Sequence, residues 1–223
     1  MAKTVIQKIN NKGSARLFSS SLLEFFTRAH PALIFSIYLP IIFYLPYYSK
    51  MHFGFTGIKL ACLIFSGLLL WSLTEYLLHR FVFHYEPSSA WGKRISYLFH
   101  GNHHEFPRDK ERLFMPPVPS LIISSLFLMS FYVVVERNAF VLFSGFMLGY
   151  LIYGSMHYAI HAGKPPFRWM KGLWKNHELH HYKHADKGFG VTSTLWDHVF
   201  FTMYDIKERK LNAETEKANN RLA

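Results

Sequence analysis

The chain has 223 residues, of which 50% are hydrophobic and 18% aromatic, enough for one domain built either around a soluble core or across a membrane. Its single cysteine, Cys62, lies in an apolar run and excludes a disulfide framework. The formal net charge of +11 predicts attraction to an anionic surface, and the positions of the basic residues indicate which one.

Four segments predict membrane spans, because each offers roughly the 17 to 25 apolar residues that cross the hydrocarbon layer. They are residues 31–48, 60–78, 119–135 and 139–156. Pro40 and Pro46 are expected to kink or shorten the first span. The sequence therefore predicts an all-α integral membrane protein with one domain, residues 1–223. Its tail, residues 207–223, alternates charges and is expected to be flexible.

The basic residues predict the orientation of these spans. Of the 25 Lys and Arg residues, 22 lie before the first span, between the second and third, or after the fourth. The two short connections carry only Lys50, Lys59 and Arg137. By the positive-inside rule, both termini and the middle segment face the cytoplasm. This topology and anionic lipid headgroups account for the net charge, so no nucleic-acid partner is expected.

Histidines repeat in the two halves of the chain. After each pair of spans comes a histidine pair and then a histidine trio, and 16 residues separate pair from trio in both halves. The pairs are His79 with His84 and His157 with His161, and the trios are His100, His103, His104 and His177, His180, His181. The repeat predicts two equivalent halves that contribute to one site.

Helical spacing determines which of these rings align. In an α-helix the trio spacing i, i+3, i+4 places three imidazoles on one face, and His157 and His161 at i, i+4 also align. His79 and His84, at i, i+5, are expected to diverge by about 140°. The stretches between pair and trio carry apolar stripes and predict amphipathic helices under the bilayer. The rings meet only if these helices pack around a shared centre.

Ten gathered imidazoles would repel one another if charged and would be costly if buried without partners. A divalent metal removes both problems, because neutral imidazole is its commonest protein ligand. Ten ligands exceed what one ion accepts, so the sequence predicts two ions with about five imidazoles each, or four plus solvent. An all-nitrogen site binds zinc as readily as iron, so zinc in a purified sample would not identify the native metal.

A second interpretation comes from His177, Glu178 and His181, which satisfy the H-E-x-x-H pattern of zinc proteases. Such an enzyme uses two histidines, the glutamate as general base and one further ligand, which leaves most of the repeat without a role. The counterpart in the first half, "HGNHH", has no glutamate. We expect Glu178 to face solvent or to support a ligand, and a membrane zinc metalloprotease stays the alternative of another class.

The order of these motifs resembles the membrane fatty acid hydroxylase superfamily, most closely the fatty acid 2-hydroxylases of sphingolipid acyl chains. The matching stretches are "EYLLHRFVFH", "HGNHHEFPRDKERLFMPPVPS", "MHYAIH" and "HELHHYKHADKGFGVTSTLWDHVFFT". "PPVP" and "GFGVTSTLWD" are the specific pieces, because histidine boxes also occur in sterol oxidases, desaturases and carotenoid hydroxylases. The resemblance implies hydroxylation beside an acyl carbonyl, with four spans and a cytosolic helical cap. A sterol or carotenoid oxygenase is the neighbouring alternative.

The resemblance also implies a cofactor, an oxidant and partners. It assigns two iron ions to ten ligands: His79, His84, His100, His103, His104, His157, His161, His177, His180 and His181. The resemblance implies O2 as the oxidant. Eukaryotic relatives often carry an N-terminal haem-binding electron-transfer domain, which the roughly 30 residues before the first span cannot hold, so a separate protein is expected to supply the electrons. The membrane is that of the endoplasmic reticulum or the bacterial inner membrane.

A lipid acyl chain is expected to enter sideways from the bilayer, between the spans. Six aromatic residues are candidates to line its path: Tyr150, Tyr153, Tyr158, Phe189, Trp196 and Phe200. Ordinary core packing is the alternative for each of them. Three polar residues are candidates to support the ligands from behind: Glu75, His184 and Asp197. Glu75 is expected to accept a hydrogen bond from a ligand imidazole or to pair with Arg80, and His184 has an ordinary surface position as its alternative.

Overall fold

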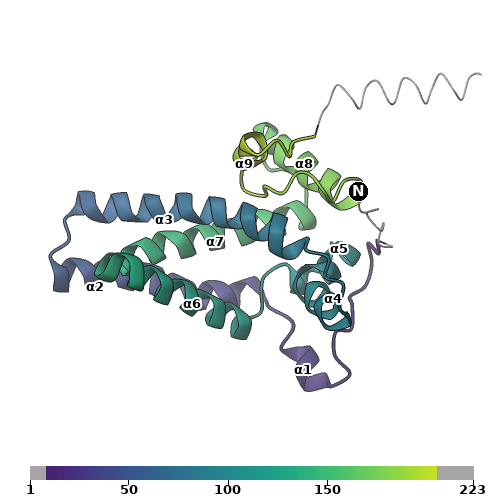
Figure 1. Cartoon of the computed structure of the whole chain (residues 1–223), viewed down its shortest axis with the longest axis horizontal. Coiled ribbons are helices and arrows are strands. Elements are labelled where there is room, and N and C mark those ends of the chain that lie inside the picture. The colour runs from purple at the N-terminus through teal and green to yellow at the C-terminus, as the bar shows by residue number, and fades with distance from the viewer. Residues whose placement is uncertain (1–8, 205–223) are drawn as a thin grey trace, which may run out of the picture.

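The computed structural model describes residues 9–204, and every regular element in that part of the chain is helical (Figure 1). Four long helices form a bundle, and short helices gather at one end of it. The long helices are α2 (Pro31–Phe53), α3 (Gly57–Leu77), α6 (Pro117–Val135) and α7 (Ala139–Ala162). The predicted flexible tail, residues 207–223, lies outside the described residues.

Within residues 9–204, three helical runs are long and apolar enough to cross a membrane: Pro31–Phe53, Gly57–Phe83 and Lys110–Ala162. The third contains both α6 and α7, joined by a single turn of 3-10 helix, η4 (Glu136–Asn138). The predicted shortening of the first span is wrong, because α2 continues for 23 residues through Pro40 and Pro46. Membrane helices tolerate proline where neighbouring helices and hydroxyl side chains satisfy the freed backbone groups.

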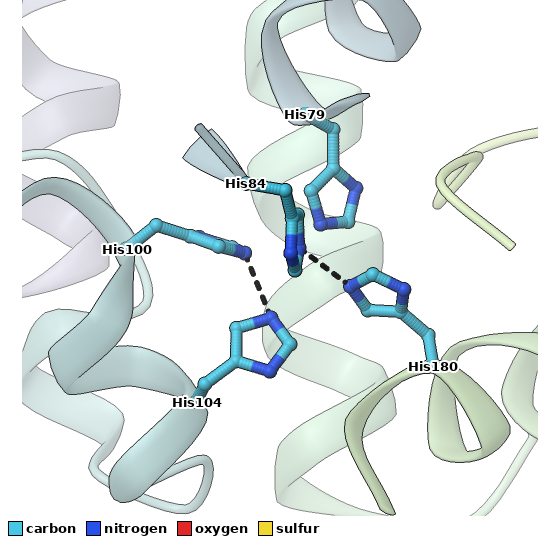
Figure 2. Close-up of side chains that lie close together, drawn as sticks. All are labelled: His79, His84, His100, His104 and His180. Carbon is cyan, nitrogen blue, oxygen red and sulfur yellow. Dashed lines mark hydrogen bonds between the residues drawn. The ribbon is translucent and has the colours of Figure 1, made fainter. Parts of the chain in front are cut away.

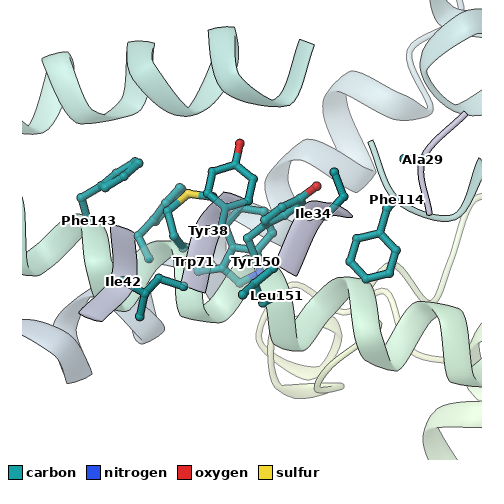
Figure 3. Close-up of a cluster of buried hydrophobic side chains, with 11 residues drawn as sticks. Ala29, Ile34, Tyr38, Ile42, Trp71, Phe114, Phe143, Tyr150 and Leu151 are labelled. Atoms are coloured by element: carbon teal, nitrogen blue, oxygen red, sulfur yellow. The ribbon is translucent and has the colours of Figure 1, made fainter. Parts of the chain in front are cut away.

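Helix α7 lies at the centre of the bundle and contacts α2, α3 and α6. Its closest neighbour is α3, because Gly67 of α3 and Gly145 of α7 let the two backbones touch. A Cβ at either glycine would collide with the backbone of the facing helix. Trp71 and Tyr150 pack edge to face beside this contact, within a cluster of buried aromatic and aliphatic side chains (Figure 3). The bundle is therefore held by close backbone approach and interlocking rings.

The short elements form what we call the cap, at one end of the bundle (Figure 1). It contains the π-helices η1 (Leu78–Phe83) and η2 (Tyr97–Gly101), the single 3-10 turns η3 (Lys110–Arg112) and η5 (Arg168–Met170), and the helices α4 (Ala90–Ser96), α5 (Asn102–Glu105), α8 (Lys171–Tyr182) and α9 (Leu195–Val199). Residues 9–30, with α1 (Ser21–Phe25), run along the same end. The nearly buried Arg112 pairs with Glu24 and Asp109 and fastens this segment to the cap. All ten repeat histidines lie in the cap or at the bundle ends that it covers.

Candidate metal centre

The ten repeat histidines meet in two groups of five, and within each group the candidate ligand atoms lie within 4.8 Å of one another. The first cluster is His79, His84, His100, His104 and His180. The second cluster is His103, His157, His161, His177 and His181. Figure 2 shows the five rings of the first cluster turned toward a common centre from three separate parts of the chain.

The structure corrects the expected divergence of His79 and His84. The chain between them is the π-helix η1, in which the backbone N–H of His84 donates to the carbonyl of His79 at 3.3 Å. A π-helix has i→i+5 hydrogen bonds and a wider turn than an α-helix, so residues five apart lie on nearly the same side instead of diverging. The ring centroids are 5.1 Å apart, and both rings belong to the first cluster. A local change of helix type therefore brings this pair into register.

Each histidine trio is divided between the two clusters. His180 belongs to the first cluster, although its neighbour His181 on α8 belongs to the second. Conversely, His103 belongs to the second cluster and His100 and His104 to the first. The trios thus exchange one ring each, which makes neither half of the chain complete alone.

In the first cluster, ring nitrogens face ring nitrogens. Nε2 of His180 lies 2.9 Å from Nε2 of His84, and Nε2 of His104 lies 3.1 Å from Nε2 of His100. Nε2 of His79 is buried and has no hydrogen-bond partner in the part of the chain that the structure describes. Two nitrogens bound at right angles to one ion, at about 2.1 Å each, would be about 3.0 Å apart. The spacing and the unpartnered nitrogen fit a metal ion at this centre.

The second cluster repeats this geometry with other residues. Nε2 of His103 lies 2.9 Å from Nε2 of His157 and 3.0 Å from Nε2 of His181. Nε2 of His177 lies 2.9 Å from Nε2 of His161 and 3.1 Å from Nε2 of His181. Five nitrogens at such separations suit a second ion, and an all-imidazole donor set suits iron, zinc or copper.

Burial keeps the cap histidines uncharged. Desolvation lowers the pKa of His84 and of His180 to about 3, and repulsion from a neighbouring imidazole adds to this effect. The same causes lower the pKa well below 6.5 in the other cap members: His100, His103, His104, His177 and His181. These rings are neutral at pH 7, and neutral imidazole is the form that binds metal.

One loop, which we call the ligand loop (residues 187–192), orients two rings of the first cluster. Nδ1 of His180 donates to the carbonyl of Lys187 at 2.7 Å, and Nδ1 of His79 donates to the carbonyl of Phe189 at 2.6 Å. Each ring, when neutral, then has its lone pair on Nε2, directed into the cluster. Gly188 gives the loop a φ of 70°, which favours glycine.

Two buried carboxylates fasten the ligand loop. Asp197, with no exposed surface, accepts the backbone N–H groups of Phe189 at 2.9 Å and Gly190 at 2.8 Å. Glu75 of α3 accepts the N–H groups of Val191 and Thr192, each at 2.9 Å. Glu75 was expected to meet a ligand ring or Arg80; instead it holds the loop, and Arg80 donates to the Tyr76 hydroxyl at 2.9 Å. The two carbonyl acceptors could not be predicted from the sequence, because backbone groups have no residue signature.

An apolar cavity of about 600 Å³ adjoins both clusters. His100 of the first cluster and His103 and His157 of the second lie in its wall. Of the six aromatic candidates, Tyr150 and Tyr153 line the cavity. The other four are absent from its lining: Tyr158, Phe189, Trp196 and Phe200. Phe189 lies in the ligand loop, Trp196 in α9 and Phe200 directly after α9, and Phe189 packs edge to face on Tyr76.

The family model for fatty acid hydroxylases matches residues 64–202, which include all ten clustered histidines, the ligand loop and Asp197. The chain belongs to the fatty acid hydroxylase family. Among solved structures, this family member is similar to the hydroxylase domain of full-length scs7p, with a TM-score of 0.80 and 35% sequence identity. The match covers 87% of this chain and 74% of the other.

Relatives of this fatty acid hydroxylase include a dihydroceramide fatty acyl 2-hydroxylase of Arabidopsis thaliana, 37% identical over 86% of this chain and 81% of that protein. A ceramide very long chain fatty acid hydroxylase of Saccharomyces cerevisiae is 38% identical over 86% of this chain and 50% of its own length. A fatty acid 2-hydroxylase of Rattus norvegicus is 32% identical over 84% of this chain. This chain spans 56% of the rat protein.

Two polar residues singled out in the sequence lie away from the cluster centres. Glu178 is exposed on α8, although His177 and His181 on either side of it are buried in the second cluster. A protease general base would have to face the metal instead. His184 is also exposed, and its ring packs against Tyr204. In this fatty acid hydroxylase, neither position supports a direct role at the clusters.

Proposed function

We propose that this protein is a dimetal oxygenase that adds a hydroxyl group to C2 of a long fatty acyl chain, free or in a ceramide. The observation that carries the proposal is the apolar cavity of about 600 Å³ whose wall contains histidines of both clusters. This is the size and character of a pocket for a long hydrocarbon chain. The names of the plant, yeast and mammalian relatives support the same acyl position and lipid class.

We propose two iron ions, one in each five-histidine cluster. Bound iron would supply the change of oxidation state that reduction of O2 requires. Hydroxylation inserts one oxygen atom of O2 into a C–H bond, while the other leaves as water after uptake of two electrons and two protons. A separate electron-transfer protein is proposed as the source of these electrons.

The protein's own groups contribute position and exclusion of water. The carbonyls of Lys187 and Phe189 hold the Nδ1 protons of His180 and His79, so that Nε2 of each ring faces the cluster. The apolar wall near His157, which includes Tyr153, keeps bulk water from the acyl chain. A chain held beside His100 and His103 lies against both clusters, which favours reaction near one end of the chain.

We also propose that α2, α3, α6 and α7 each cross the bilayer and that the cap and both termini face the cytoplasm. The turn η4 between α6 and α7 supports two crossings in place of one long run. The basic residues concentrated outside the two short connections support the orientation.

Comparative lipid mass spectrometry tests the function. Cells that express the wild type are expected to gain 2-hydroxy acyl lipids, and cells that express His180→Ala are expected to lose them, because His180 lies in the first cluster. A gain of oxygen on sterols or carotenoids instead would assign the protein to the neighbouring oxygenase class. Unchanged lipids together with a peptidase activity lost in Glu178→Gln would favour the protease interpretation.

A further inference from the structure

The short helix α1 presents two different apolar faces. Leu22 and Phe25, three residues apart, are 67% and 70% exposed and are not part of the cavity wall. Leu23 and Phe26, also three residues apart, line the apolar cavity. Residues at i and i+3 share a face of a helix, so Leu23 and Phe26, each 51% exposed, form a face that borders the cavity, and Leu22 and Phe25 form a more open face beside it.

This open apolar face is held in place by the rest of the structure. The carboxylate of Glu24 pairs with Arg112 and accepts the backbone N–H groups of Leu17 and Phe18, each at 2.9 Å. Arg28 pairs with Glu111 at 2.7 Å just after the helix. These ion pairs and hydrogen bonds hold α1 in place while its large apolar side chains stay exposed. An exposed apolar face of this kind indicates a contact surface.

The position of α1 indicates what covers that face. Phe25 precedes Pro31, the first residue of the apolar helix α2, by six residues. Val118 and Pro119, in the first turn of another apolar helix, α6, line the cavity together with Leu23 and Phe26. Figure 1 places α1 beside this end of the bundle, away from α8 and α9. The open face of α1 therefore lies at the level where two membrane-crossing helices begin.

The basic residues next to α1 also suit a position at the membrane surface. Arg16 and Arg28 are exposed on either side of α1 in the sequence, and Arg28 also pairs with Glu111. A short apolar helix flanked by basic side chains is typical of a segment that lies in the membrane interface, with its cations at the lipid phosphates.

We infer that α1 is embedded in the cytoplasmic leaflet through Leu22 and Phe25, and that the acyl chain passes from that leaflet into the cavity between α1 and the start of α6. Leu23 and Phe26 form the threshold of this passage, together with Val118 of the same cavity wall. The passage rests on the proposed function, whereas the embedding of α1 does not.

Spin labelling tests the embedding. In a Cys62→Ala background, a label at Phe25→Cys is placed in vesicles of phosphatidylcholine and phosphatidylglycerol, with a label at the exposed Asp186→Cys as the aqueous control. The label at position 25 is expected to collide more often with oxygen than with a water-soluble nickel chelate, and the label at 186 to show the reverse. A label at position 25 that favours the nickel chelate would overturn the inference, even in an active hydroxylase.

Two double variants and a distant control test the passage. Leu23→Trp with Phe26→Trp enlarges the threshold side chains, and the turnover of long-chain lipid is expected to fall roughly tenfold with both metals retained, in line with the cost of overpacking. Leu23→Ala with Phe26→Ala opens the threshold and is expected to slow turnover less than the tryptophan pair does. Val133→Trp, 83% exposed at the far end of α6, is expected to behave as wild type. Wild-type turnover in the tryptophan pair would overturn the passage; an inactive wild type with a lipid-embedded label would overturn only the proposed function.

Discussion

The two histidine clusters contain the same number of the same side chain but are supported in different ways. In the first cluster, His79 and His180 donate to carbonyls of the ligand loop. In the second, the one such contact among residues 9–204 is a long one, between Nδ1 of His157 and the carbonyl of Leu113 at 3.5 Å, and Nδ1 of His177 and Nδ1 of His181 are buried without a partner there. The second cluster instead takes four of its five rings from the regular helices α7 and α8.

This difference shows two ways of fixing a ring. A regular helix fixes the Cα positions of residues four apart, such as His177 and His181, and leaves ring rotation to packing. A carbonyl acceptor fixes the rotation and tautomer of the ring directly. The first cluster, built on π-helical turns, depends on its loop, so changes to the loop should affect one metal site and spare the other.

The largest effect is expected from neighbouring substitutions on α8. His180→Ala should remove the metal of the first cluster and His181→Ala the metal of the second, because adjacent residues serve different centres. Each variant should retain about one ion and lose 2-hydroxylation, as measured by metal analysis and lipid mass spectrometry. Glu178→Gln, exposed on the same helix, is the matched control and should retain both ions. Loss of the same ion in both alanine variants would refute the division of the trio.

A smaller, selective effect is expected from Asp197→Asn. Asp197 accepts the backbone N–H groups of Phe189 and Gly190 with its two oxygens. In the asparagine variant one of these oxygens is replaced by an N–H2 group, a donor that cannot accept, so the ligand loop and its carbonyls should shift. Loss of such outer support typically costs about 10- to 100-fold in metal affinity. Metal titration should show this weakening at the first site alone. Asp186→Asn, exposed in the turn after α8, serves as control, and equal weakening of both sites by Asp197→Asn would contradict the account.

Acid should destabilise the metal-free protein. Burial lowers the pKa of His84 and of His180 to about 3, whereas an unfolded histidine has a pKa near 6.5. Between these values the unfolded state binds more protons, so stability is full above about pH 6.5 and declines as the pH falls toward 3. The melting temperature of metal-free protein in detergent should therefore fall from pH 7 to pH 5. A melting temperature that stays constant over this range would argue against buried, neutral clusters.

The smallest effect is expected from Glu75→Gln. The amide oxygen can still accept the N–H groups of Val191 and Thr192, and the Thr192 hydroxyl, now 2.7 Å from the carboxylate, can rotate to accept from the new N–H2 group. Affinity of the first site should fall only a few-fold, less than in Asp197→Asn. Glu75→Leu removes both acceptor oxygens and should lower the metal affinity of the first site more than Glu75→Gln does. A metal titration in which Glu75→Gln loses more affinity at the first site than Asp197→Asn would contradict the proposed order.

The sequence predicted the long helices and identified the ten histidines that the structure brings together. Spacing sufficed there, because apolar runs and a repeated 16-residue gap are properties of the side chains themselves. Spacing did not reveal that His79 and His84 align, since it was judged on α-helical geometry and the chain changes from α- to π-helix at Leu78.

Other features depended on contacts between distant segments. The assignment of His103 and His180 to opposite clusters follows from how the two halves meet, which i, i+3, i+4 spacing leaves open. Glu75 and Asp197 could be named as buried acids, but their partners are backbone N–H groups of the ligand loop, which have no sequence signature. The threshold at α1 was likewise not predicted, because no feature of the sequence distinguishes Leu23 and Phe26 from other apolar residues. Only their position in the cavity wall does so.

The number of metal ions per chain tests the central claim most directly. Wild-type protein purified in detergent and loaded with ferrous iron without oxygen should contain two ions per polypeptide, counted by mass spectrometry of the metal against amino-acid analysis. Ten histidines in two groups of five predict that value. A preparation that is fully active in 2-hydroxylation with a single ion per chain would contradict the account.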